Sequence, residues 1–339
     1  MLSHKVYVFE FITAGCMVDP QPSLLREGLA MRNAIANDLQ AIPGFEVRIA
    51  GDDTCNNRNL KFEEMLAWCD SYLIIAPEIG MWLTQRIQSA LPWNKRSLGS
   101  NLSSSELSST KYHLAEHWRK HGVRTPRTYL WEEWVNGAAT YPAVVKPCNG
   151  AGSMAVFRID RKSDYECHGG ICDQARDEGL FEDGSLFQPC VLGRHASIAF
   201  LIGPKQIVPL RPTFQMLSGD GRFHYLGGQL PIRADLEARA IALGKKAVEC
   251  VPGLAGYVGV DMVLGHDPEG YLDYAIEINP RLTTSYVGLR ALADFNIAQM
   301  MIDVFEGKPV AEPTWKPGRV RFYPDGRVDH DLTPGAVFG

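Results

Sequence analysis

A short segment of alternating apolar and polar residues, followed by Pro280-Arg281, constrains the fold of this 339-residue chain most strongly. Apolar and polar residues alternate over residues 271–279, the pattern of a β-strand with one buried face, because successive strand side chains point to opposite sides. The residues predicted to face a core are Leu272, Tyr274, Ile276 and Ile278. Those predicted on the other face are Asp273, Glu277 and Asn279. A carboxylate and an amide oxygen beside Arg281 suit Mg²⁺ that carries a polyphosphate, although Glu-x-Asn alone also fits a solvated strand face.

A second strand is predicted over residues 257–264, with Asp261 on the face opposite its apolar residues. The link of residues 265–270 is rich in turn formers, so the two strands are expected to form a hairpin. A symmetric register would place Tyr274 opposite Asp261. Asp261 and Glu277 share a face only if the pairing slips by one residue or contains a bulge. We expect that shift, which would group Asp261, Glu277 and Asn279 around one or two Mg²⁺ or Mn²⁺ ions.

A lysine-ended strand and a glycine segment form the third motif. The strand of residues 143–147 contains Lys146, and an apolar strand of residues 154–159 follows the glycines. A Walker loop has its lysine after the glycines and leads into a helix, so that motif is excluded. Glycines let backbone N–H groups approach phosphate oxygens, and Lys146 adds a positive charge. The glycine segment alone also fits an ordinary hairpin turn; its residues are Gly150, Ala151, Gly152 and Ser153.

These motifs, in this order, resemble the ATP-grasp superfamily over about residues 101–310. The amino-acid sequence of residues 277–290 is similar to that of the tyramine–glutamate ligase branch, whose members are enzymes of methanofuran assembly. The resemblance implies a ligase in which ATP activates an acid as an acyl phosphate, and an amine then displaces the phosphate. It also implies an ATP-grasp domain over residues 101–310, with a small mobile lid at about residues 125–186, and a Pro/Gly-rich extension over residues 311–339.

The first 100 residues are expected to form a parallel α/β domain, since predicted strands and helices alternate there. The strands are predicted at residues 5–12, 45–49 and 72–77. A helix capped by Ser23 is expected to reach about residue 40, and another to span residues 61–69. The serine-dense residues 97–109 mark the predicted domain boundary. The fold class is therefore α/β followed by α+β, and residues 320–328 are expected to add a small hairpin.

The resemblance assigns roles at the nucleotide. Lys111 and Lys146 would hold the α and β phosphates, and the segment 150–153 would close over the γ phosphate, although Lys111 also fits a solvated position in a helix. Arg281 and Lys146 are the residues expected to act in catalysis. The hinge segment and His195 would contact the nucleotide; the hinge residues are Gln188, Pro189, Cys190 and Val191. Family members often carry Glu at position 188 and an acidic residue near position 195.

Substrate contacts are expected from loops near this site. The residues concerned are Glu10, Arg211, Tyr225, Gly228, Arg281, Tyr286 and Arg290. Glu10 lies late in the first predicted strand, and strand carboxyl ends of a parallel sheet open onto a ligand crevice, so its carboxylate could hold an ammonium group. Pairing with a local arginine, or capping of the next turn, is the structural alternative for Glu10.

Composition narrows the function classes. The net charge is −5 and no basic tract occurs, so nucleic acid is not an expected partner. No apolar run approaches the roughly 18 residues that cross a membrane, and the start of the chain lacks a signal-peptide pattern. Eight cysteines without a CxxC motif indicate free thiols and the cytoplasm. The expected partners are a small-molecule acid, an amine and possible second copies in a homodimer. Other amino-acid or peptide substrates, and a nucleotide-binding regulatory protein without turnover, are the alternatives.

Overall fold

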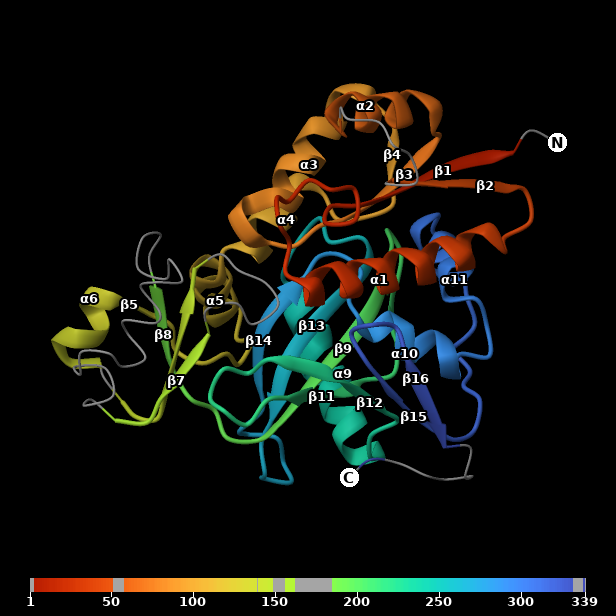
Figure 1. Ribbon diagram of the computed structural model, residues 1–339. Coiled ribbons are helices and arrows are strands. Elements are labelled where there is room, and N and C mark those ends of the chain that lie inside the picture. The colour runs from red at the N-terminus through yellow and green to blue at the C-terminus, as the bar shows by residue number, and fades with distance from the viewer. Residues whose placement is uncertain are drawn as a thin grey trace.

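The computed structural model describes residues 3–50, 58–138, 140–148, 156–161, 185–331 and 338. Within these residues the strands form three sheets, which lie in separate parts of the molecule (Figure 1). The N-terminal sheet lies at the top of the view, the central sheet in the middle and a small sheet at the left. Among the described helices, none combines the length and the apolar character needed to cross a bilayer.

The N-terminal sheet is parallel throughout and has the order β2–β1–β3–β4. Its strands are β1 (His4–Glu10), β2 (Phe45–Ile49), β3 (Ser71–Ile75) and β4 (Arg96–Ser97). The helices and 3₁₀ turns around it are α1 (Pro22–Gln40), α2 (Arg58–Trp68), η1 (Ile79–Met81), α3 (Trp82–Ala90) and η2 (Leu91–Trp93). The predicted parallel α/β unit is thus confirmed. The Ser23 cap is wrong, because Pro22 opens α1 and places Ser23 inside its first turn.

Strand alternation divides the core of this domain between the two faces of its sheet. Val6 and Val8 pack with the apolar side of α1, which also contacts the helices of the central domain. Tyr7 and Phe9 pack on the opposite face with residues of α2 and α3. Helix α1 therefore lies between the N-terminal sheet and the rest of the chain, as Figure 1 shows.

The central sheet has the order β14–β13–β9–β11–β12–β15–β16, and β10 pairs with β9. Its strands are β9 (Arg194–Ile202), β10 (Ile207–Pro209), β11 (Thr213–Leu217), β12 (Tyr225–Leu230), β13 (Gly256–Leu264), β14 (Tyr274–Asn279), β15 (Arg319–Phe322) and β16 (Val328–Asp331). The predicted hairpin in the tail is confirmed as β15 and β16, which extend this sheet beyond β12.

Helices cover the two faces of the central sheet unequally. One face packs on α5 (Lys111–Lys120) and α9 (Ala234–Glu249). The other face carries Tyr257 and packs on α10 (Ser285–Leu292) and α11 (Ile297–Phe305). Asp261 lies on the same face as Tyr257, four residues along β13, where it lines a cleft instead of meeting a helix. The part of the sheet that α10 and α11 leave open is therefore the floor of the functional site.

The small sheet has the order β5–β8–β6–β7. Its elements are β5 (Tyr129–Leu130), α6 (Trp131–Glu133), η3 (Trp134–Ala138), β6 (Ala143–Pro147), β7 (Phe157–Ile159) and β8 (Ser185–Pro189). Trp134 stacks on Phe187 in its separate core. Most of the serine-dense segment before this sheet forms helix α4 (Leu102–Ser109), in which four serines are buried. The domain limits and the mobility of the lid stay predictions.

Candidate active site

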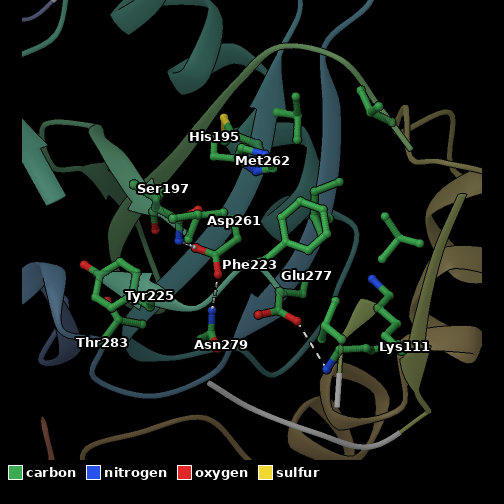
Figure 2. Close-up of a pocket in the computed structure, with 18 of the residues that line it drawn as sticks. Lys111, His195, Ser197, Phe223, Tyr225, Asp261, Met262, Glu277, Asn279 and Thr283 are labelled. Carbon is green, nitrogen blue, oxygen red and sulfur yellow. Dashed lines mark hydrogen bonds and ion pairs between the residues drawn. The ribbon is translucent and has the colours of Figure 1, made fainter. Parts of the chain in front are cut away.

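A single cleft brings together residues from the N-terminal helix α1, the small sheet and the open face of the central sheet. Lys111, at the start of α5, and Lys146, in β6, line one part of it. Asp261, Glu277 and Asn279 line its floor, and Figure 2 shows their side chains pointing toward one another. Motifs separated by more than 100 residues in sequence therefore form one site.

The predicted register shift between β13 and β14 is confirmed. Asp261 lies directly opposite Glu277, and Met262 lies opposite Ala275, so Ile276 is the extra residue of a β-bulge. Asn279 lies opposite Gly259, on the same face. The bulge places both carboxylates on the cleft side of the sheet, where a regular hairpin would have separated them.

The same bulge overturns part of the predicted strand pattern. Upstream of Ile276 the two faces exchange, so Ala275 enters the core while Ile276 lines the cleft. Leu272 was predicted to face a core and is half exposed, because β14 begins only at Tyr274. Asp273 is buried and ion-paired with Arg239, so its role is structural.

Hydrogen bonds hold the carboxylate of Asp261 in place. Gln215 Nε2 donates to Asp261 Oδ1 at 3.1 Å, and Asn279 Nδ2 donates to Asp261 Oδ2 at 3.2 Å (Figure 2). Ser197 lies opposite Asp261 on β9 and also hydrogen-bonds to it. Burial raises the pKa of Asp261, and the neighbouring Glu277 carboxylate raises it further. A cation beside this pair would relieve both effects.

The two lysines balance the charge of Glu277. Lys111 Nζ lies 3.2 Å from Glu277 Oε2, as the dashed line in Figure 2 marks. Burial alone would raise the pKa of Glu277, but Lys111 and Lys146 lower it overall. Burial, with a contribution from Lys111, lowers the pKa of Lys146 to about 8. Two lysines and two carboxylates thus share a largely buried site, an arrangement suited to an anionic ligand with a divalent cation.

The donor set fits Mg²⁺ or Mn²⁺, which prefer carboxylate, carbonyl and water oxygens. Across the described part of the chain, no three His, Cys, Asp or Glu side chains gather in a metal-binding arrangement. The candidate ligands are therefore two carboxylates, Asp261 and Glu277, with the amide of Asn279. Mg²⁺ commonly takes one or two protein carboxylates and completes its shell with water and phosphate oxygens, so this set is sufficient.

The comparisons with known proteins agree with this geometry. The ATP-grasp domain family matches residues 108–285, more than half of the chain. The chain belongs to the ATP-grasp family. It is an ATP-dependent carboxylate–amine ligase by family and reaction class, as the resemblance implied, because the curated relatives that it matches are ligases of that type.

Two curated relatives and one solved structure are similar to this chain over most of its length. The chain is 26% identical to a tyramine–L-glutamate ligase of Methanocaldococcus fervens, over 88% of this chain and 92% of that protein. It is 29% identical to the enzyme of the same name from Methanocaldococcus jannaschii, over 69% of this chain and 62% of that protein. Among solved structures, an ATP-grasp superfamily protein from Archaeoglobus fulgidus superposes with a TM-score of 0.70 at 25% identity, covering 94% of this chain and 92% of that one.

The predicted hinge of this ATP-grasp chain borders the cleft. Gln188, Pro189, Cys190 and Val191 all line it, and so does His195, whose pKa burial lowers. The Gln188 side chain donates to Thr128 Oγ1 at 2.7 Å, so its amide is already fixed by the small sheet. The glycine segment, with Gly150, Ala151, Gly152 and Ser153, lies outside the described residues.

Arg281 lies in the cleft, and its guanidinium is oriented by the N-terminal domain. Arg281 Nε and Nη2 donate to the two oxygens of Glu78 at 3.0 and 2.7 Å, and Nη1 donates to the carbonyl of Leu282 at 3.0 Å. Glu78 precedes η1 and is buried. This fork-to-fork pair holds the arginine in one orientation across a domain boundary.

The remaining predicted substrate residues divide into two groups. Tyr225 lines the cleft beside Thr283 and Asn279 (Figure 2). The others are not among the residues that line it. Arg211 lies 3.8 Å from Glu237, and Gly228 leaves room for the Phe322 ring. Tyr286 and Arg290 both bind Asp38 of α1, so their contacts join the domains.

Glu10 is also absent from the cleft lining. Its carboxylate accepts hydrogen bonds from the Ile12 and Thr13 amides at 3.1 and 2.6 Å. It also packs against Gly28 of α1, where an added Cβ would lie 2.6 Å from Glu10 Oε2. This geometry favours the structural alternative, in which Glu10 caps the turn after β1.

Sequence reasoning missed the residues that the N-terminal domain contributes. Glu27 of α1 lines the cleft, and Glu78 orients Arg281. Their sequence neighbourhoods carry no spacing signal, because their partners lie more than 200 residues away. Thr283 and Thr284, which also line the cleft, lie two and three residues after Arg281 and could have been suspected from that position.

Proposed function

We propose that this ATP-grasp enzyme joins a small carboxylic acid to an amine through an acyl phosphate, with L-glutamate and tyramine as the first candidate substrates. The observation that carries the proposal is the single cleft in which Lys111 and Lys146 face the Asp261–Glu277 pair. The names of the two methanogen relatives support the candidate substrates. At 26–29% identity, other amino acids or peptides belong in the same test.

The lysines and the hinge define how ATP would bind. Lys146 and Lys111 would hold the polyphosphate as point charges, replacing part of their present interaction with Glu277. The residues 188–191 would border the adenine between the small sheet and the central sheet. Bound Mg²⁺, held by Asp261, Glu277 and Asn279, would neutralise phosphate charge.

The chain's own residues position the two reacting groups. A carboxylate oxygen of the acid attacks the γ phosphorus, the bond to the β-phosphate oxygen breaks, and ADP leaves. The amine nitrogen then attacks the acyl carbon, phosphate departs, and the nitrogen loses a proton to give the amide. Arg281, fixed by Glu78, faces the cleft where negative charge develops on the transferred group. Because the arginine is already oriented, it need not reorganise during transfer.

The decisive assay measures ADP release from ATP with magnesium, first with L-glutamate and tyramine and then with a panel of acids and amines. Release that requires both an acid and an amine supports a ligase. Release with no organic substrate would contradict the proposal, because it would show that water is the phosphoryl acceptor. No release under any combination would also contradict it and would favour a nucleotide-binding protein without turnover.

A matched pair of variants makes the assay specific. Lys146→Gln should abolish ADP release, because Lys146 lines the cleft. Lys245→Gln removes a lysine that is 55% exposed on α9 and should leave release unchanged. Location in the cytoplasm and formation of a homodimer remain predictions; gel filtration with light scattering would test the second.

A further inference from the structure

One acidic side chain in the cleft has no role in the ligase scheme above. Glu27 lies in the first half of α1 and lines the cleft together with Tyr225 and Thr284. Thr284 Oγ1 donates a hydrogen bond to Glu27 Oε1. The carboxylate therefore lies next to the start of α10, away from the hinge residues that would border adenine.

The charge of Glu27 is incompletely compensated. Within the described residues, Thr284 supplies its one recorded hydrogen bond, which leaves Oε2 available. Arg281 is near enough to act on Glu27 electrostatically, but its hydrogen bonds within the described residues go to Glu78 and to the Leu282 carbonyl. Burial accordingly raises the pKa of Glu27, with only partial offset from Thr284 and Arg281.

The surroundings of Glu27 suit a small organic cation. Tyr225 lines the same cleft, and burial raises the pKa of its phenol, with a further rise from the charge of Glu27. An ammonium group beside Glu27 would gain a charge-assisted hydrogen bond, and the Tyr225 ring could face it. The Glu27 side chain is part-buried and lines the cleft, and its Oε2 is not one of the buried oxygens that lack a partner, so it can receive a ligand from the cleft side.

We propose that Glu27 is the binding residue for the ammonium group of an amino substrate, at the end of the cleft formed by α1 and the start of α10. This inference rests on the proposed ligase function. The ammonium group could belong to an amino acid that supplies the carboxylate or to the amine that attacks it. Both sources share one chemistry, and the choice of ligands in the test separates them.

The test compares ligands that differ only in the ammonium group. Dissociation constants are measured by calorimetry on the full chain with magnesium and a non-hydrolysable ATP analogue. The pairs are L-glutamate against glutarate, and tyramine against 4-ethylphenol. Wild-type enzyme should prefer the ammonium-bearing member of at least one pair, and Glu27→Gln should reduce that preference about tenfold or more. The affected pair identifies which substrate Glu27 binds.

The control variants isolate the charge. Glu27→Gln keeps an acceptor for Thr284 and should fold normally, which its melting temperature checks. Glu27→Asp retains the charge and should retain more of the preference than Glu27→Gln. Glu106→Gln, at an exposed position on α4, should change neither ratio.

The possible outcomes also separate the two proposals. If wild type shows no preference in either pair, or Glu27→Gln leaves both ratios unchanged, the ammonium site is refuted. ADP release by wild type tests the ligase function separately. If Glu27→Gln loses the preference but wild type releases no ADP, the ammonium site is supported and the ligase function is refuted. If wild type releases ADP but the ratios are unchanged in Glu27→Gln, the ligase function is supported and the ammonium site is refuted.

Discussion

Replacing Glu78 with glutamine should destabilise the whole chain through one buried arginine. The side chains of Glu78 and Arg281 are only 5% and 11% exposed, and two hydrogen bonds join them. Glutamine is nearly isosteric, so the change removes charge without leaving a cavity. It leaves a buried guanidinium without its carboxylate, and breaking such a pair costs about 3–5 kcal/mol.

The size of the effect can be expressed as a melting temperature. Unfolding entropy of about 2.1 cal/mol/K per residue gives about 0.7 kcal/mol/K for a chain of this length, if it unfolds as one unit. The expected loss then lowers the melting temperature by about 4–7 °C. Differential scanning calorimetry measures this directly, and urea denaturation followed by circular dichroism gives the free energy of unfolding.

An exposed pair of the same geometry provides the control. Arg119 Nε and Nη2 donate to the two oxygens of Glu116 at 3.1 and 2.8 Å, but those side chains are 62% and 31% exposed. Glu116→Gln should therefore shift the melting temperature by no more than about 1 °C, since solvent screens surface pairs. Equal shifts for Glu78→Gln and Glu116→Gln would refute the claim that burial makes the first pair important.

Three further predictions concern the cleft and its surroundings. Glu277→Gln should reduce magnesium-dependent ADP release about 100-fold or more in a chain that still folds, as circular dichroism checks, whereas the exposed Glu269→Gln should have no effect. Because the pKa of Lys146 is lowered to about 8, its side chain is mostly protonated and positively charged below that pH. ATP affinity should therefore be highest below about pH 7 and fall as the pH rises through 8. Lys146→Arg, which stays charged, should flatten that profile in equilibrium titrations; a persistent fall would assign it to another group. Glu10→Gln should cost about 1 kcal/mol in urea denaturation, because an amide offers one acceptor oxygen for two backbone N–H groups, and should leave both substrate KM values unchanged. If Glu10→Gln raises the KM for the amine while stability stays normal, Glu10 contributes to the amine site after all.

Sequence periodicity alone determined which strand faces carry the chemistry. Polar residues at two-residue spacing put Glu277 and Asn279 on one face of a strand, and turn formers after Leu264 predicted the hairpin with Asp261. The strand–helix alternation of the first 100 residues likewise predicted the parallel sheet. These features follow from local backbone geometry, so they can be read from neighbouring residues.

Contacts between distant segments were decided only by the tertiary structure. Glu27 reaches the cleft and Glu78 reaches Arg281 because α1 and the loop before η1 pack against the central domain. No periodicity links these two residues to Thr284 or Arg281. A one-residue slip or a bulge was inferred from the need to unite two carboxylates. Its position at Ile276, which turns Ala275 into the core and Ile276 toward the cleft, was missed. Side-chain spacing fixes the face on which a residue lies, but burial and charge pairing depend on which surface packs there.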